Sequence, residues 1–189
     1  MPFSSNSGKG HIRRIVNKLK PKTALDIGVG AGTYAKLFPH LEWTGVEIWG
    51  PYIEKYGLSN LYPALHNINA KDFYPTKRYD ICFLGDVLEH MGTEDAIDVF
   101  DRMRESCDTL IVSIPMGDYP QGEYDGNPYE RHITDGWSVP AFHSMFDISD
   151  YYVVDGDIGV FVYTPHDVKL KIAVYAISKN EAHFVERFC

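Results

Sequence analysis

The distribution of apolar residues predicts a chain in which short strands alternate with helices. Four runs rich in β-branched and aromatic residues lie at 23–27, 43–48, 79–84 and 109–114. Apolar residues at helical spacing separate these runs, at about 32–38, 52–56 and 93–106. Strands that alternate with helices form βαβ units, in which the strands run parallel within one sheet. The pattern therefore predicts an α/β fold.

The end of this pattern differs from its start. Two further β-rich runs, 151–154 and 159–163, flank a turn sequence, which predicts an antiparallel hairpin. A short helix is expected near 138–146. Between the fourth strand and this helix lies the segment 117–136, which is rich in glycine, tyrosine and acidic residues and too long to be a simple connector.

The strongest chemical signal is a glycine turn at the end of the first strand. The chain runs from Asp26 through Gly28, Gly30 and Gly32 into a helix. Glycines let a ligand approach the backbone closely, and the helix presents free N–H groups. The third glycine comes one position too early for the dinucleotide fingerprint. Because Asp26 would repel a phosphate and suit an ammonium group, the turn favours a cofactor with a methionine moiety over NAD.

Two further carboxylates follow later strands. Glu47 ends the second strand, 19 residues after Gly28, where a carboxylate can accept hydrogen bonds from both ribose hydroxyls. Asp72 and Phe73 are expected to bind an adenine amino group and to cover its ring, with a solvated turn as the alternative. Ligands of open α/β sheets bind at the carboxyl ends of the strands, so these residues and Asp86 are expected at one edge of the sheet.

This set of motifs resembles the Rossmann-like, class I methyltransferases that use S-adenosylmethionine, in particular the branch that acts on small molecules. The resemblance covers about residues 10–165 and rests on the glycine turn, Glu47, Asp72 and the run Asp-Val-Leu-Glu-His at 86–90. It implies a three-layer sandwich around a seven-stranded sheet of order 3-2-1-4-5-7-6, with strand 7 antiparallel. It also implies S-adenosylmethionine as the cofactor.

The same resemblance implies a role for each cofactor residue. Asp26, Gly28 and Gly30 would surround the methionine end, with Gly32 completing the turn. Glu47 would hold the ribose, while Ile48 and Phe73 would sandwich the adenine. Asp72 would read the adenine amino group and Asp86 would line the methyl side.

Two histidines are the candidates for the methyl acceptor side. His90 comes shortly after the strand expected at 79–84, and His132 lies in the long segment 117–136. A neutral histidine is the most suitable base for a hydroxyl acceptor near pH 7. A structural or surface role is the alternative for each, because most histidines have no part in catalysis.

A divalent metal held by Asp86, Glu89, His90 and His132 is a further alternative, as in catechol-type methyltransferases. Glu89 and His90 are adjacent and so do not share a helix face, and the sequence contains no HxH or ExxH spacing there. We therefore predict that the site holds no metal.

Charge and cysteine content narrow the possible partners. The chain of 189 residues carries 18 Lys and Arg against 26 Asp and Glu, a net charge of −8, which disfavours nucleic-acid binding. Its three cysteines lack a metal-ligand spacing. With no secretory signal and no apolar run long enough to span a bilayer, we expect a cytoplasmic location and no membrane partner.

The last residues are not needed for the implied sheet, which is complete at about residue 163. The chain continues with an apolar strand and a Lys-Asn-Glu turn at 179–181. This segment resembles the opening of GT-A-type glycosyltransferases. We expect a methyltransferase domain at 1–165 and an extension at 166–189 that could begin a fused glycosyltransferase domain. The alternative is an extra strand at the sheet edge.

The sequence thus predicts a methyltransferase that moves a methyl group from S-adenosylmethionine to an oxygen or nitrogen of a small molecule or glycan. The alternative from another class is a catalytically silent module that binds S-adenosylmethionine and serves as a docking partner. The long segment 117–136 favours an enzyme, because a silent binder has no need of a lid.

Overall fold

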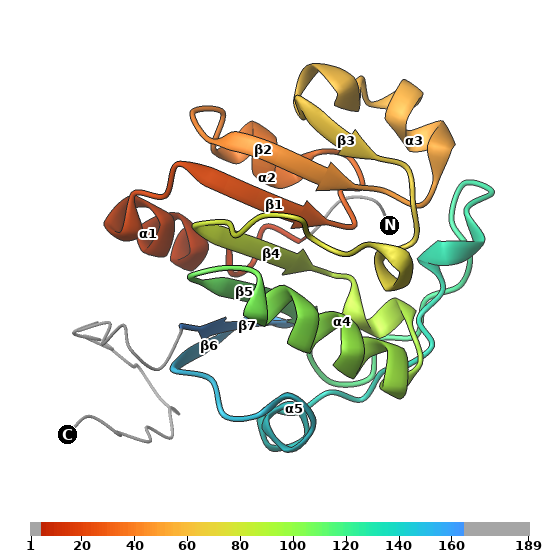
Figure 1. The fold of residues 1–189 in the computed structure, drawn as a ribbon. Coiled ribbons are helices and arrows are strands. Elements are labelled where there is room, and N and C mark those ends of the chain that lie inside the picture. Colours follow the sequence, from red (N-terminus) through yellow and green to blue (C-terminus); the bar gives the residue numbers. More distant parts are fainter. Residues whose placement is uncertain (1–4, 165–189) are drawn as a thin grey trace.

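A computed structural model describes residues 5–164; the predicted extension at 166–189 lies outside the described residues. Its centre is a seven-stranded sheet of order β3-β2-β1-β4-β5-β7-β6 (Figure 1). The strands are β1 Thr23–Ile27, β2 Glu42–Val46, β3 Ala64–His66, β4 Ile81–Gly85, β5 Leu110–Pro115, β6 Tyr151–Asp155 and β7 Ile158–Tyr163. β7 runs antiparallel to both of its neighbours, whereas β1 to β5 pair in parallel. The predicted α/β fold, strand order and antiparallel strand are confirmed.

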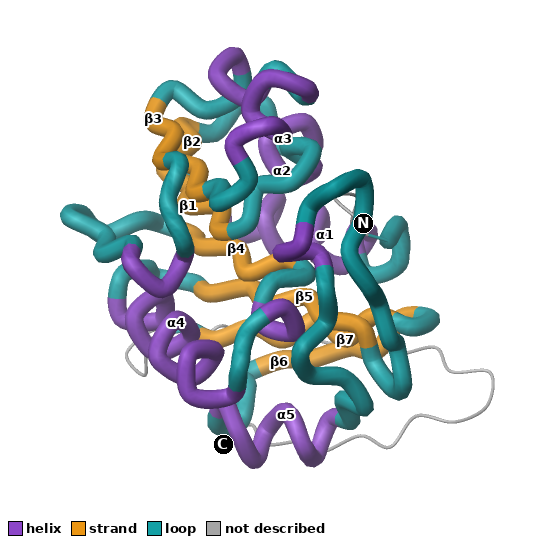
Figure 2. The backbone as a smooth tube through the Cα atoms, turned by 90° about the vertical axis from the view of Figure 1, so that its right-hand side faces the viewer, coloured by secondary structure: helices purple, strands orange, loops and turns teal. Residues whose placement is uncertain are grey.

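Helices cover both faces of this sheet. They are α1 Lys9–Leu19, α2 Thr33–Leu37, α3 Gly50–Lys55, α4 Thr93–Glu105 and α5 Val139–Phe146. Seen along the sheet, α4 lies on one side and α1, α2 and α3 lie on the other (Figure 2). The molecule is therefore the expected three-layer sandwich. None of the helices described in residues 5–164 has the length and hydropathy needed to cross a membrane.

The alternation of side chains along each strand divides the core in two. On one face, Leu25, Cys82 and Leu84 pack with residues of α4 and α5, and on the other, Ile81 and Phe83 pack with residues of α1 and α2. Buried strands with two covered faces read as continuous apolar runs, which is why the sequence pattern located most of them.

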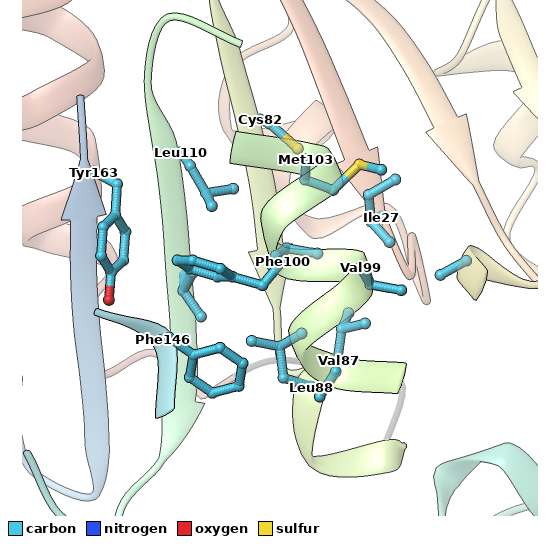
Figure 3. Packing of buried hydrophobic residues seen from close by; sticks show 14 of the residues in the cluster. Ile27, Cys82, Val87, Leu88, Val99, Phe100, Met103, Leu110, Phe146 and Tyr163 are labelled. Carbon is cyan, nitrogen blue, oxygen red and sulfur yellow. The ribbon is translucent and has the colours of Figure 1, made fainter. Parts of the chain in front are cut away.

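Phe100 of α4 lies at the centre of the first core layer. Its ring centroid is 5.0 Å from that of Phe146 and 4.9 Å from that of Tyr163 (Figure 3). The side chain is 1% exposed, and burial of a phenylalanine stabilises a fold by about 1.5 to 3 kcal/mol. These contacts pack α4 against α5 and β7.

One strand was absent from the sequence pattern. β3 has only three residues, and Ala64 and His66 are both exposed at the sheet edge. Such a strand carries neither an apolar run nor a clear alternation, so only the family resemblance implied a seventh strand. The C-terminal hairpin has its expected place, with Gly156 and Asp157 as the two-residue turn between β6 and β7.

Candidate active site

A pocket of about 300 Å³ lies at the carboxyl ends of β1, β2 and β4. This is the edge to which the arrowheads of these strands point in Figure 1, beside the segment 117–136. The residues that line the pocket come from the strand ends, from the turns after them and from that segment: Gly28, Val29, Gly30, Thr33, Tyr34, Val46, Glu47, Ile48, Tyr52, Ile68, Asn69, Ala70, Lys71, Gly85, Asp86, Val87, His90, Met91, Gly92, Asp95, Asn127, Tyr129, Glu130 and Ile133.

The glycine turn forms one wall of the pocket. Gly28 has a φ of 71°, and its N–H donates to the carbonyl of Val46 at 2.9 Å. A Cβ atom on Gly28 would lie 2.5 Å from Cγ2 of Val87, so only glycine fits this position. Gly30 also lines the pocket. Gly32, with a φ of 76°, does not line it and instead precedes α2 as its N-cap.

Glu47 reaches across the turn that it faces. One carboxylate oxygen accepts the N–H of Gly30 at 2.8 Å, and the other accepts the N–H of Trp49 at 2.8 Å. Burial raises the pKa of Glu47 to about 7, although these two hydrogen bonds oppose the shift. Each carboxylate oxygen has a second acceptor position. Glu47 can therefore still accept hydrogen bonds from a ligand in the pocket, as the sequence predicts.

Asp26 lies behind the turn and does not line the pocket. It is 1% exposed, and Tyr62 donates its hydroxyl to the carboxylate at 2.5 Å. Burial raises the pKa of Asp26 to about 7, against the effect of the Tyr62 hydrogen bond. The Asp26 side chain is therefore buried behind the glycine turn and does not contact the pocket.

The residues after β3 differ from those that the sequence singled out. Asp72 is exposed, and Phe73 is buried in the core with its ring 5.1 Å from that of His66, so neither lines the pocket. Asn69 and Lys71 line it instead. The signal that could have found them is the position of β3, because the pocket side chains begin directly after the end of that strand.

Asp86 follows β4 and faces the pocket beside Gly85. Its N–H donates to the carbonyl of Ser113 on β5 at 2.9 Å, and its φ of 54° is uncommon for a residue with a side chain. A short helical turn, η3 Leu88–His90, comes next and carries His90 into the pocket wall. The run 86–90 thus lies where the sequence places it.

The segment 117–136 closes one side of the pocket, and sequence reasoning missed most of its contributions. Asn127, Tyr129 and Glu130 line the pocket, on or beside the short turn η4 Pro128–Glu130. Tyr52 of α3 donates its hydroxyl to the carboxylate of Glu130 at 3.0 Å. This long-range contact holds the segment beside α3 at the wall of the pocket.

The two candidate histidines lie together. The ring centroids of His90 and His132 are 4.8 Å apart, although only His90 lines the pocket. Burial lowers the pKa of His90 to about 4 and lowers the pKa of His132 as well. Both imidazoles are therefore neutral at pH 7. The neighbouring Glu89 is buried, and burial together with Asp86 raises the pKa of its carboxyl group.

The pocket is rich in acidic groups. Glu47, Asp86, Asp95 and Glu130 line it, against Lys71 as the one lysine or arginine of its described lining. Lys71 pairs with Asp95 at 2.9 Å, so carboxyl groups exceed cationic side chains by three. A ligand that brings positive charge stabilises the ionised carboxylates, whereas a pyrophosphate opposes them.

Comparisons with known proteins bear on the fold. No family model and no curated protein sequence matches the chain. The methyltransferase domain of bacterial CtHen1-CN superposes with a TM-score of 0.61 at 18% identity, over 82% of this chain and 96% of that one. The chain has the class I methyltransferase fold.

Two further solved structures share this fold. The N-methyltransferase NodS of Bradyrhizobium japonicum, solved with S-adenosyl-L-homocysteine, gives a TM-score of 0.58 at 14% identity, over 85% of this chain and 89% of that one. An O-methyltransferase family protein from Burkholderia thailandensis gives 0.58 at 13% identity, over 82% of this chain and 55% of that one. This chain thus spans about half the length of the Burkholderia protein.

Proposed function

We propose that the protein is a methyltransferase that uses S-adenosylmethionine and acts on an oxygen or nitrogen of a small molecule or glycan. The observation that carries the proposal is Glu47, which faces the pocket from the end of β2 and bridges to the N–H of Gly30 in the glycine turn at 2.8 Å. The shared class I methyltransferase fold and the excess of carboxyl groups in the pocket support the same cofactor.

The chain's own residues divide the work of binding. Glu47 would hold the ribose hydroxyls, and Gly28 and Gly30 would let the methionine part approach the backbone. Asn69 would bind the adenine amino group, and Ile48, which also lines the pocket, would pack against the adenine ring. Asp86, which lines the pocket after β4, would face the methyl group.

S-adenosylmethionine, when bound, supplies a methyl group on an already activated sulfonium. The protein's part is then mainly to align the acceptor atom with that group. His90 lines the pocket, and its ring lies 4.8 Å from that of His132 in the segment 117–136, so we assign the acceptor to this side of the pocket. A sugar acceptor is supported only by the likeness of 166–189 to a glycosyltransferase opening.

Calorimetric titration with S-adenosylhomocysteine and with NAD tests the cofactor assignment. We expect the first to bind and the second not to. Glu47→Ala should weaken the binding of S-adenosylhomocysteine by about 1 to 3 kcal/mol, because the ribose hydroxyls that Glu47 would hold lose their hydrogen-bond acceptor. Glu42→Ala is the matched control: Glu42 lies at the opposite end of the same strand, exposed and paired with Lys77.

Turnover is tested separately, with methyl-labelled cofactor and a panel of small-molecule, sugar, protein and nucleic-acid acceptors. Label transfer to a small molecule or sugar is the expected result. Binding of S-adenosylhomocysteine without transfer to any acceptor would favour the silent docking module. Tight NAD binding would refute the cofactor assignment itself.

A further inference from the structure

Glu89, His90 and His132 form a cluster that the binding of a cofactor does not explain. One potential ligand atom from each of the three side chains lies within 4.8 Å of the others. Ligand atoms around one transition-metal ion lie about 3 to 4 Å apart, given bonds of about 2.0 to 2.2 Å. Small side-chain rotations would thus bring all three atoms to one ion.

The fold brings these residues together from distant parts of the sequence. Glu89 and His90 are adjacent on η3, while His132 comes from the segment 117–136. The N–H groups of Ile133 and Thr134 both donate to the carbonyl of Glu89, at 2.8 and 3.1 Å. These backbone hydrogen bonds fix His132 beside the other two, which is why no HxH or ExxH spacing in the sequence marks the cluster.

The two histidines are prepared in one tautomer. Nδ1 of His90 lies 3.1 Å from the carbonyl oxygen of Arg131, and Nδ1 of His132 lies 2.6 Å from that of Tyr119. A carbonyl oxygen only accepts, so both Nδ1 atoms carry the proton and both Nε2 atoms keep a lone pair. Imidazoles that bind a metal are oriented in this way, by a hydrogen bond from the other ring nitrogen to a carbonyl or carboxylate.

The carboxylate of Glu89 supplies the independent observation. The residue is 1% exposed, yet within residues 5–164 neither of its carboxylate oxygens accepts a hydrogen bond from another residue. No lysine or arginine in residues 5–164 forms an ion pair with it; the nearby Arg131 pairs with Glu123 instead. A buried carboxylate with no partner is costly, because it has lost its water and gained nothing in exchange. A bound cation would satisfy it.

Against the expectation from the sequence that the site holds no metal, we propose that Glu89, His90 and His132 bind a divalent first-row transition metal. Two imidazole nitrogens and one carboxylate suit Mn²⁺, Fe²⁺, Co²⁺ or Zn²⁺ better than Mg²⁺ or Ca²⁺, which prefer oxygen donors throughout. Three protein ligands leave coordination positions open. If the protein is the methyltransferase of the proposed function, an open position can take an oxygen or nitrogen of the acceptor, since His90 lines the pocket.

Such an ion would make a separate base unnecessary. A hydroxyl bound to a divalent metal releases its proton to water more readily than a free hydroxyl, and the oxygen then presents its lone pair to the methyl group. In this arrangement the two histidines act through the ion and transfer no proton themselves.

The test is metal binding by the full chain after dialysis against a chelator, without S-adenosylmethionine. Co²⁺ is the probe, followed by its visible absorption and by calorimetry. We expect one equivalent to bind in the wild type, binding at least 10-fold weaker in Glu89→Gln and His132→Asn, and Mg²⁺ far weaker than Co²⁺. His40→Asn is the control, because His40 is exposed and remote from the pocket; it should bind Co²⁺ like the wild type.

The outcomes separate this proposal from the proposed function. Wild-type protein that binds no stoichiometric Co²⁺, or variants that bind it as tightly as the wild type, would overturn the metal site. Should Glu89→Gln fail to fold by circular dichroism, His132→Asn decides alone. Intact Co²⁺ binding with no binding of S-adenosylhomocysteine would refute the methyltransferase assignment and leave the metal site standing.

Discussion

The buried carboxyl group of Asp26 should make the stability of the protein depend on pH in an unusual direction. Burial raises the pKa of Asp26 from 3.8 to about 7, with a smaller contribution from Glu47. Between these two pH values the folded state keeps a proton that the unfolded state has lost. The contribution of Asp26 to the free energy of unfolding must therefore fall as the pH rises from about 4 to 7 and be constant on either side.

The size of the effect follows from the shift. About three pH units at 1.36 kcal/mol per unit correspond to about 4 kcal/mol, a large part of a typical total of about 5 to 15 kcal/mol. Asp26→Asn removes the ionisable group but keeps an oxygen that can accept the hydrogen bond from the Tyr62 hydroxyl, which lies 2.5 Å from the Asp26 carboxylate in the wild type. The free energy of unfolding of the variant should equal that of the wild type at pH 4 and exceed it by up to about 4 kcal/mol at pH 8.

Urea unfolding of both proteins at pH 4 to 8 is the measurement. Asp80→Asn serves as the control, because Asp80 accepts the N–H groups of Thr23 and Lys22 and these hydrogen bonds lower its pKa. The carboxyl group of Asp80 titrates below this range, so the free energy of unfolding of Asp80→Asn should change with pH in parallel with that of the wild type. If Asp26→Asn is also parallel to the wild type across the range, Asp26 does not titrate near neutrality and the reasoning is wrong.

Three further predictions concern the turn, the core and the domain boundary. Gly28→Ala should lower the free energy of unfolding by about 1 to 2 kcal/mol or more, because the backbone is left-handed there and the new Cβ atom would clash with Val87. Gly10→Ala in α1 is the control: with open space around Gly10, it should leave the free energy of unfolding unchanged or raise it by up to about 1 kcal/mol. Urea unfolding measures both variants. Phe100→Ala should cost about 3 to 5 kcal/mol in the same assay. A fragment truncated after Pro165 should fold and bind S-adenosylhomocysteine like the full chain; loss of folding would assign 166–189 to this domain.

The sequence predicted those elements whose signal is local. Strands buried on both faces, such as β4, carry continuous apolar runs, and a two-residue turn marks the hairpin at Gly156 and Asp157. β3 gave no such signal, because an edge strand of three partly exposed residues needs neither apolar side chains nor alternation. The strand order itself came from the family resemblance and not from the pattern of residues.

The same distinction separates the site residues that could be predicted from those that could not. Gly28 and Glu47 lie directly at strand ends, so their place in the pocket follows from the position of the strand. Asn69 was missed together with β3, and Glu130 was missed because its position depends on Tyr52, 78 residues earlier. No spacing within the segment 117–136 encodes that contact.

These long-range contacts give the segment 117–136 a defined position that its composition does not suggest. At its base, Gly117 and Trp137 exchange backbone contacts, with the N–H of Gly117 donating to the carbonyl of Trp137 at 2.7 Å. Further along, Glu130 is tied to α3 and Ile133 to Glu89. A segment held at three points presents its side chains in a fixed geometry, which is the condition for aligning an acceptor or a metal ligand. Glu130, which lines the pocket, and His132, whose ring lies beside that of His90, are two residues apart, so movement of this segment would displace both.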